Sequence, residues 1–221
     1  NHDYGTYQQV LLAGRILLSV FVIGIPFSMY YFLGVLDEDK RGRFISQTKA
    51  LLFIFGCLAA AFTLIFSGYI GEHMSNEGLK YLLLIYAGYI LFYISGEYLE
   101  HTLIMLDRVR LLIWISPVEN IIRVVFLFVP ILLGAGVPGI VAGLSVYAVL
   151  RFAAYWLIDA RVRPGRRFSF DPALLKDQFV YTLPIALQSF VAIGNQLLDK
   201  IFVAVAFTPA HFAIYSVGSF E

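Results

Sequence analysis

The segment ALLFIFGCLAAAFTLIFSGYI, residues 50–70, contains no charged side chain. A run of roughly 18 or more apolar residues is long enough, as an α-helix, to cross the hydrocarbon core of a bilayer. We therefore predict a transmembrane helix here. Working outward by the same criterion, we predict five further helices, the third and the last of the six being interrupted by ionisable residues: residues 8–33, 81–106, 111–133, 137–158 and 179–206.

The composition supports an integral membrane protein of the all-α class, a polytopic helix bundle. Hydrophobic residues make up 60% of the chain and charged residues 14%, with a mean hydropathy of +0.80, whereas a soluble domain carries about 25% charged residues. The net charge of +1 gives no reason to expect a nucleic-acid partner. The single cysteine, Cys57, excludes an internal disulfide and a cysteine-based metal cluster. We expect no metal and no cofactor.

The basic residues fall on alternate loops. Of the Lys and Arg residues between the predicted helices, all but Lys80 lie in residues 34–49, 107–110 and 159–178, so the positive-inside rule places these loops in the cytoplasm. The residues concerned are Lys40, Arg41, Arg43, Lys49, Arg108, Arg110, Arg161, Arg163, Arg166, Arg167 and Lys176. The segments 1–7, 71–80, 134–138 and 208–211 should then face outward. An outward start without an initiating Met predicts an upstream helix.

A weak internal repeat links the two ends of the chain. Residues 3–7, DYGTY, align with residues 211–215, HFAIY, each just before a helix enters from outside. Six crossings separate them, and an even number preserves orientation, as in transporters built from parallel repeats. We therefore predict an incomplete N-terminal bundle (1–160), a basic cytoplasmic loop (161–178) and the start of a second bundle (179–221). The apolar run at 212–221 predicts a further helix that continues beyond the chain.

Three stretches carry a family resemblance: GIPFSMYYFL (24–33) with the following LDEDKRGRF, NQLLDKIF (195–202) and FAIYSVG (212–218). They resemble the second helix, the seventh helix and the start of the eighth helix of bacterial polysaccharide transporters, the O-antigen and exopolysaccharide flippases. That family belongs to a superfamily with the multidrug and toxic compound extrusion transporters and the lipid II flippases. The resemblance implies that the chain holds helices two to seven of a two-bundle transporter.

The resemblance also implies a function at the bacterial inner membrane. Such a protein flips an undecaprenyl-pyrophosphate-linked oligosaccharide between leaflets by alternating access, for lipopolysaccharide or exopolysaccharide synthesis. Its expected partners are the lipid-linked oligosaccharide, the lipid bilayer, and the polysaccharide polymerase and chain-length proteins.

An anionic, polar cargo requires a cavity with cations and hydrogen-bonding groups, and ionisable residues within spans are the candidates. Our predicted cavity residues are Arg15, Arg123, Lys200 and the stripe Gln188, Asn195 and Asp199, which share one helix face by their spacing. Three alternatives remain open. Arg15 could extend to the outer interface, Lys200 could be held in an ion pair, and Arg123 could pair with Glu119 one turn earlier. Arg151 is expected to reach the cytoplasmic interface and lies outside the predicted site.

The carboxylates within spans suggest a second role. Glu97 lies three and four residues before Glu100 and His101, so it can contact both, and Glu119 adds a fourth ionisable group. We predict Glu97, Glu100 and Glu119 as candidates for coupling to a proton or cation. The alternative is that they only satisfy polar partners on neighbouring helices.

Enzyme signatures are lacking: the sequence has no Gly-rich phosphate loop, no Gly-x-Ser-x-Gly elbow and no His-Glu-x-x-His helix. We expect no enzyme activity and no catalytic residue. Two other classes remain as alternatives. A cation-coupled multidrug exporter would use a cavity dominated by carboxylates, and a polytopic glycan ligase or acyltransferase would need a sizeable external loop.

Overall fold

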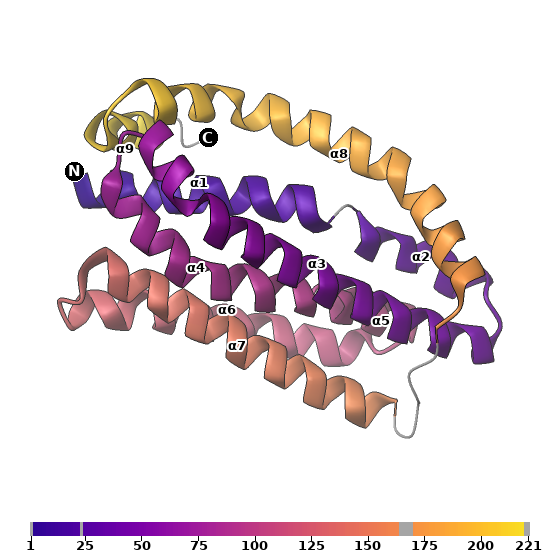
Figure 1. The fold of residues 1–221 in the computed structure, drawn as a ribbon. Helices are drawn as coiled ribbons and strands as arrows, with labels where there is room; N and C mark the ends of the chain where they lie inside the picture. The colour runs from indigo at the N-terminus through magenta and orange to yellow at the C-terminus, as the bar shows by residue number, and fades with distance from the viewer. Residues whose placement is uncertain (1, 23, 164–169, 219–221) are drawn as a thin grey trace.

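The computed structural model of the protein describes residues 2–22, 24–163 and 170–218. Nearly all of these residues are helical (Figure 1). The helices are α1 (His2–Val22), α2 (Ile25–Val35), α3 (Glu38–His73), α4 (Glu77–Gly96), α5 (Tyr98–Met105), α6 (Val109–Leu132), α7 (Gly136–Val162), α8 (Pro172–Ala206) and α9 (Pro209–Gly218).

Six segments of the described chain are long and apolar enough to cross a membrane. They are α1 with α2, α3, α4 with α5, α6, α7 and α8. This confirms the predicted polytopic helix bundle. The agreement has a simple cause: hydropathy over roughly 20 residues is a local property, and it decides whether a helix can remain in lipid.

Two spans are divided into shorter helices. The first was predicted as one helix but changes direction at Gly24, whose φ of +64° favours glycine, and Pro26 lies in the first turn of α2. The third span breaks at Glu97, between α4 and α5. The last span, by contrast, is continuous helix through Asp199 and Lys200.

The helices extend further than predicted into the basic loops. α3 already begins at Glu38, α6 at Val109 and α8 at Pro172, so helix takes up most of the predicted loop 34–49 and parts of the predicted loops 107–110 and 161–178. Asp171 caps α8 by accepting hydrogen bonds from the backbone N of Ala173 and Leu174 at 3.0 and 3.3 Å. Hydropathy detects only the apolar part of a helix, whereas the hydrogen-bonded ladder can continue beyond the bilayer. Asn1, Arg166 and Arg167 lie outside the described residues.

The helices form an antiparallel bundle in which α4 is central. It packs along α3 on one side and along α7 on the other, and α6 packs along α7. α8 runs past α1 and α2, and α9 lies against α1 near the N-terminus (Figure 1). The ends of the helices that flank all three basic segments lie at the opposite end of the bundle from α9.

The core lies along α4, whereas α6 forms an apolar outer surface. Leu83, Ile90 and Ile94 of α4 are fully buried. No described residue of α6 is buried, and its Leu132 is 82% exposed. So large an apolar surface is unusual in a water-soluble monomer and ordinary for a helix that faces lipid. It is consistent with the membrane assignment.

Candidate functional site

A buried ionic cluster joins three of the spans around Arg151 of α7. This side chain, which sequence reasoning had left out of the site, is only 6% exposed. Its Nε donates to Oε1 of Glu119 on α6 at 2.7 Å, and its Nη2 donates to Oε1 of Glu97, between α4 and α5, at 3.0 Å. The Nη1 donates to the carbonyl oxygen of Tyr93 at 3.2 Å.

Tyrosines complete the cluster. The Arg151 guanidinium lies 4.5 Å from the ring centroids of both Tyr93 and Tyr155, a cation–π arrangement. The hydroxyl of Tyr147 donates to Glu119 Oε1 at 2.7 Å, and that of Tyr155 donates to Oε2 of the same carboxylate. Arg151 thus donates hydrogen bonds to two carboxylates, and the Glu119 carboxylate also accepts hydrogen bonds from two tyrosine hydroxyls. We call Glu97, Glu119, Tyr147, Arg151 and Tyr155 the Arg151 cluster.

The cluster corrects two predictions. Glu119 pairs with Arg151 across helices and not with Arg123 one turn away, and Arg151 points into the protein and not to the interface. The reason lies on α7, where Tyr147, Arg151 and Tyr155 recur every four residues and so share one face. That face presents three donors toward α6. The repeat Tyr-x-x-x-Arg-x-x-x-Tyr is the signal that could have revealed the cluster.

Of the predicted group Glu97, Glu100 and His101, the structure brings Glu97 and His101 together through the backbone of Glu97, and the role of the carboxylates in ion coupling stays a prediction. The Glu97 carboxylate faces Arg151, whereas Glu100 is exposed. The Nδ1 of His101 lies 3.2 Å from the carbonyl oxygen of Glu97, and its ring contacts Phe27 and Tyr30 with centroids 5.7 and 5.0 Å apart. Among the described residues, no group of three or more His, Cys, Asp or Glu side chains could hold a metal ion.

A row of tyrosines extends along α4 from the Arg151 cluster. Tyr86 and Tyr89 of α4 stack with centroids 4.8 Å apart, and Tyr89 stacks on Tyr93 at 5.1 Å.

Arg15 of α1 and Arg123 of α6 lie outside the Arg151 cluster. Each is exposed, and within the described part of the chain neither takes part in a hydrogen bond or ion pair. That the two arginines line a common cavity stays a prediction. The tyrosine row itself was missed by sequence reasoning, although its spacing of three and four residues was visible.

The predicted residues of α8 form a separate group. Gln188, Asn195 and Asp199 are exposed, and Lys200 is partly buried. Asp199 accepts a hydrogen bond from the Tyr215 hydroxyl on α9. No hydrogen bond or ion pair between described residues connects this stripe with Arg15 or Arg123.

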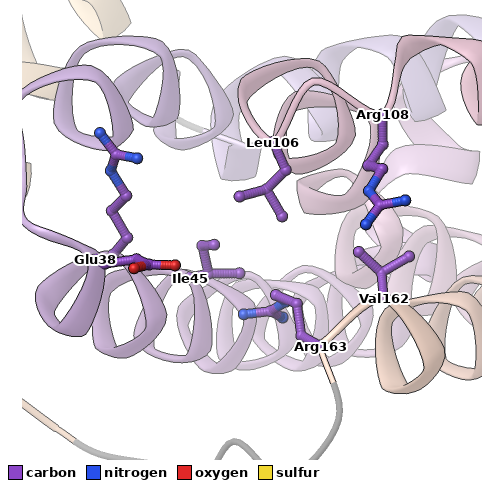
Figure 2. Close-up of a pocket in the computed structure, with 7 residues that line it drawn as sticks. Glu38, Ile45, Leu106, Arg108, Val162 and Arg163 are labelled. Carbon is purple, nitrogen blue, oxygen red and sulfur yellow. The ribbon is translucent and has the colours of Figure 1, made fainter.

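A basic pocket lies at the end of the bundle where the basic segments meet (Figure 2). It encloses about 330 Å³ between the start of α3, the α5–α6 junction and the end of α7. Sequence reasoning had assigned its arginines to three separate loops. The lining residues are Glu38, Arg41, Ile45, Leu106, Arg108, Val162 and Arg163.

In the described part of the chain, six membrane-capable helical segments with charged groups placed within them define a polytopic membrane protein. Residues 17–220 match the family model described as polysaccharide biosynthesis protein. The chain belongs to this family, which confirms the resemblance to polysaccharide transporters. No curated protein and no solved structure matches the chain.

Proposed function

We propose that the protein flips an undecaprenyl-pyrophosphate-linked oligosaccharide across the bacterial inner membrane by alternating access. Family membership supports a role in polysaccharide synthesis or transport. The absence of enzyme motifs from the sequence favours transport over catalysis. The expected setting is lipopolysaccharide or exopolysaccharide synthesis, with the polymerase and chain-length proteins as partners.

One observation carries the proposal: within the spans, two carboxylates are held in ion pairs, whereas two of the arginines are not. Glu97 and Glu119 are both bound to Arg151, whereas Arg15 and Arg123 are exposed and take part in no ion pair among the described residues. Unneutralised arginines suit a pyrophosphate, because a guanidinium binds phosphate oxygens in a bidentate manner.

The same pairing weakens the multidrug exporter alternative. A cationic cargo would require free carboxylates, and of the predicted site carboxylates Glu97, Glu100, Glu119 and Asp199, both Glu97 and Glu119 are already bound to Arg151. A third, Asp199, accepts a hydrogen bond from Tyr215. Only Glu100 among them is exposed without such a partner in the described chain.

The bundle is suited to rigid-body motion. The Arg151 cluster ties the third, fourth and fifth spans together, so we propose that they move as one unit. α8 is attached to the first two spans without an ion pair among the described residues: its Gln178 donates to the hydroxyls of Ser28 and Thr48 at 2.9 and 3.0 Å, and the backbone N of its N-cap Asp171 donates to Gln47 Oε1 at 3.0 Å. In the proposed cycle, the unit containing α8 and α9 rocks against the first five spans, and the end with the basic segments faces the cytoplasm.

The test uses the full-length protein in cells that lack their own copy of it. Arg15→Ala and Arg123→Ala should each lower surface polysaccharide, because each removes a charge that offsets the pyrophosphate. Loss of one charged hydrogen bond corresponds to about tenfold or more in affinity. Arg15→Lys should restore part of the surface polysaccharide, because the positive charge remains but the planar guanidinium that can donate two parallel hydrogen bonds is lost. Arg43→Ala, an exposed arginine of α3, is the matched control.

Protein abundance in the membrane is measured in parallel, so that failed insertion is separated from failed transport. Normal surface polysaccharide in the Arg15→Ala/Arg123→Ala double variant would overturn the proposal. Export of cationic dyes that depends on Glu100, with normal polysaccharide, would favour the multidrug exporter.

A further inference from the structure

We propose that the basic pocket at the end of the bundle is a binding site for a phosphate or pyrophosphate group. Neither Arg15 nor Arg123 lines this pocket. The inference rests on the pocket alone and not on the flippase proposal. Its lining has three arginines against one acidic residue, Glu38, and so an excess of two positive charges.

The three arginines come from three different helical segments. Arg41 lies in the first turns of α3, Arg108 at the start of α6 and Arg163 just after α7. Each of the three basic segments thus contributes one guanidinium to the same cavity. Charges that served only to attract the chain to an anionic leaflet would also gather at this end of the bundle, but they would have no need to line one cavity. Figure 2 shows Arg108 and Arg163 on either side of Val162, with Arg163 extending toward Ile45 and Glu38.

Asp159 holds the side chain of Arg163 in place, and one donor of the guanidinium has no partner among the described residues. The Arg163 side chain is only 8% exposed. The Nε donates to Oδ1 of Asp159 at 2.8 Å, and Nη2 donates to the same oxygen. The Nη1 atom is buried and has no hydrogen-bond partner among the described residues. A buried donor without a partner costs about 1–3 kcal/mol, so an acceptor entering the pocket would remove this penalty.

Asp159 does not neutralise this end of the pocket. Its Oδ2 accepts a hydrogen bond from Lys49 Nζ at 3.0 Å, so one carboxylate serves two cations. The ammonium of Lys49 is fixed in turn over the rings of Tyr98 and Trp156, at 5.3 and 5.8 Å from their centroids. The positive charge behind Arg163 is therefore preorganised and not free to rotate away.

The size and position of the pocket fit a phosphate. A water occupies about 30 Å³ in the liquid, so a cavity of 330 Å³ has room for about ten waters, enough for one or two phosphate groups. The first turn of α3 also lies at the pocket, where the positive end of the helix dipole favours anions. Both a soluble pyrophosphate and the headgroup of a membrane lipid present this chemistry.

The test measures binding to the purified full-length protein with two probes. Inorganic pyrophosphate is titrated by calorimetry in detergent, and vesicles with or without phosphatidylglycerol are used to measure lipid retention. Arg108→Ala is the main variant, because Arg108 is exposed and makes no hydrogen bond to a described side chain. It should weaken binding about tenfold, and Arg41→Ala/Arg108→Ala should weaken it further. Arg161→Ala, an exposed neighbour outside the pocket, should bind as the wild type does.

A second variant tests the buried donor directly. Arg163→Lys keeps a positive charge near Asp159 but loses the planar fork with its buried Nη1, so binding should weaken while the unfolding temperature remains near that of the wild type. An effect on pyrophosphate supports a soluble ligand, and an effect confined to phosphatidylglycerol supports a lipid headgroup. If neither probe distinguishes the pocket variants from Arg161→Ala, the proposal is overturned.

Discussion

Arg151 is the residue on which the stability of the helical core depends most directly. Arg151→Ala would leave Glu97 and Glu119 close together and without their cation. Breaking a buried ion pair from one side costs about 3–5 kcal/mol, so we expect a clearly lower unfolding temperature in detergent. Arg151→Lys should recover only part of this, because an ammonium cannot serve three acceptors in one plane. Arg161→Ala, an exposed arginine on the same helix, should leave the unfolding temperature unchanged; an equal loss in both variants would contradict the role assigned to Arg151.

Arg151 also shows what the sequence alone could not predict about individual residues. The spacing of Glu119 and Arg123 allows an ion pair along one helix, and this local rule gave the wrong partner. Glu119 instead pairs with Arg151 of α7, because this helix presents three donors, Tyr147, Arg151 and Tyr155, to its carboxylate. A sequence read one helix at a time indicates which polar groups are buried in lipid, but not which helix lies opposite them.

At the scale of elements, the close approach of α6 and α7 depends on Gly143. A Cβ at this position would lie 2.2 Å from the carbonyl oxygen of Phe126, and small residues are what allow membrane helices to pack closely. Gly143→Val should push the helices apart and cost about 1–3 kcal/mol, measured as a lower unfolding temperature. Because Glu119 and Arg151 lie on these two helices, separation should also loosen the cluster. Gly194→Val is the matched control, since nothing lies within 4 Å of its Cβ position; equal destabilisation by both would show that glycine is needed for helix flexibility and not for packing.

The number and place of the membrane-spanning helices could be predicted from the sequence, but the residues at which the helices begin could not. All six spans follow from apolar run length, yet α3 begins at Glu38, well before the apolar run at residue 50. Charged residues continue a helix readily once the backbone ladder has started. The break at Gly24 could have been anticipated, because Gly24 and Pro26 together are typical of a new helix start.

At the scale of the whole molecule, the fold makes the basic segments converge. Alternate loops of any antiparallel bundle meet at one end, so the distribution of Lys and Arg in the sequence already predicted this grouping. The basic pocket could not be predicted, because it depends on which neighbours α3, α5 and α7 have in space. The packing of α8 along α1 and α2 was likewise invisible to hydropathy.

The orientation of the bundle can be tested with single cysteines at its two ends. Glu77→Cys lies at the start of α4, and Val109→Cys lies at the start of α6; both positions are exposed. The helices between them make one crossing, so the two cysteines must lie on opposite sides of the membrane. The basic segments oppose translocation, so Glu77→Cys should react with a membrane-impermeant thiol reagent in cells with a permeabilised outer membrane. Val109→Cys should react only after the inner membrane is opened. Both variants need Cys57→Ala, since Cys57 is partly accessible. Reversed labelling would place the basic pocket outside the cell, where the inner-leaflet lipids could not reach it.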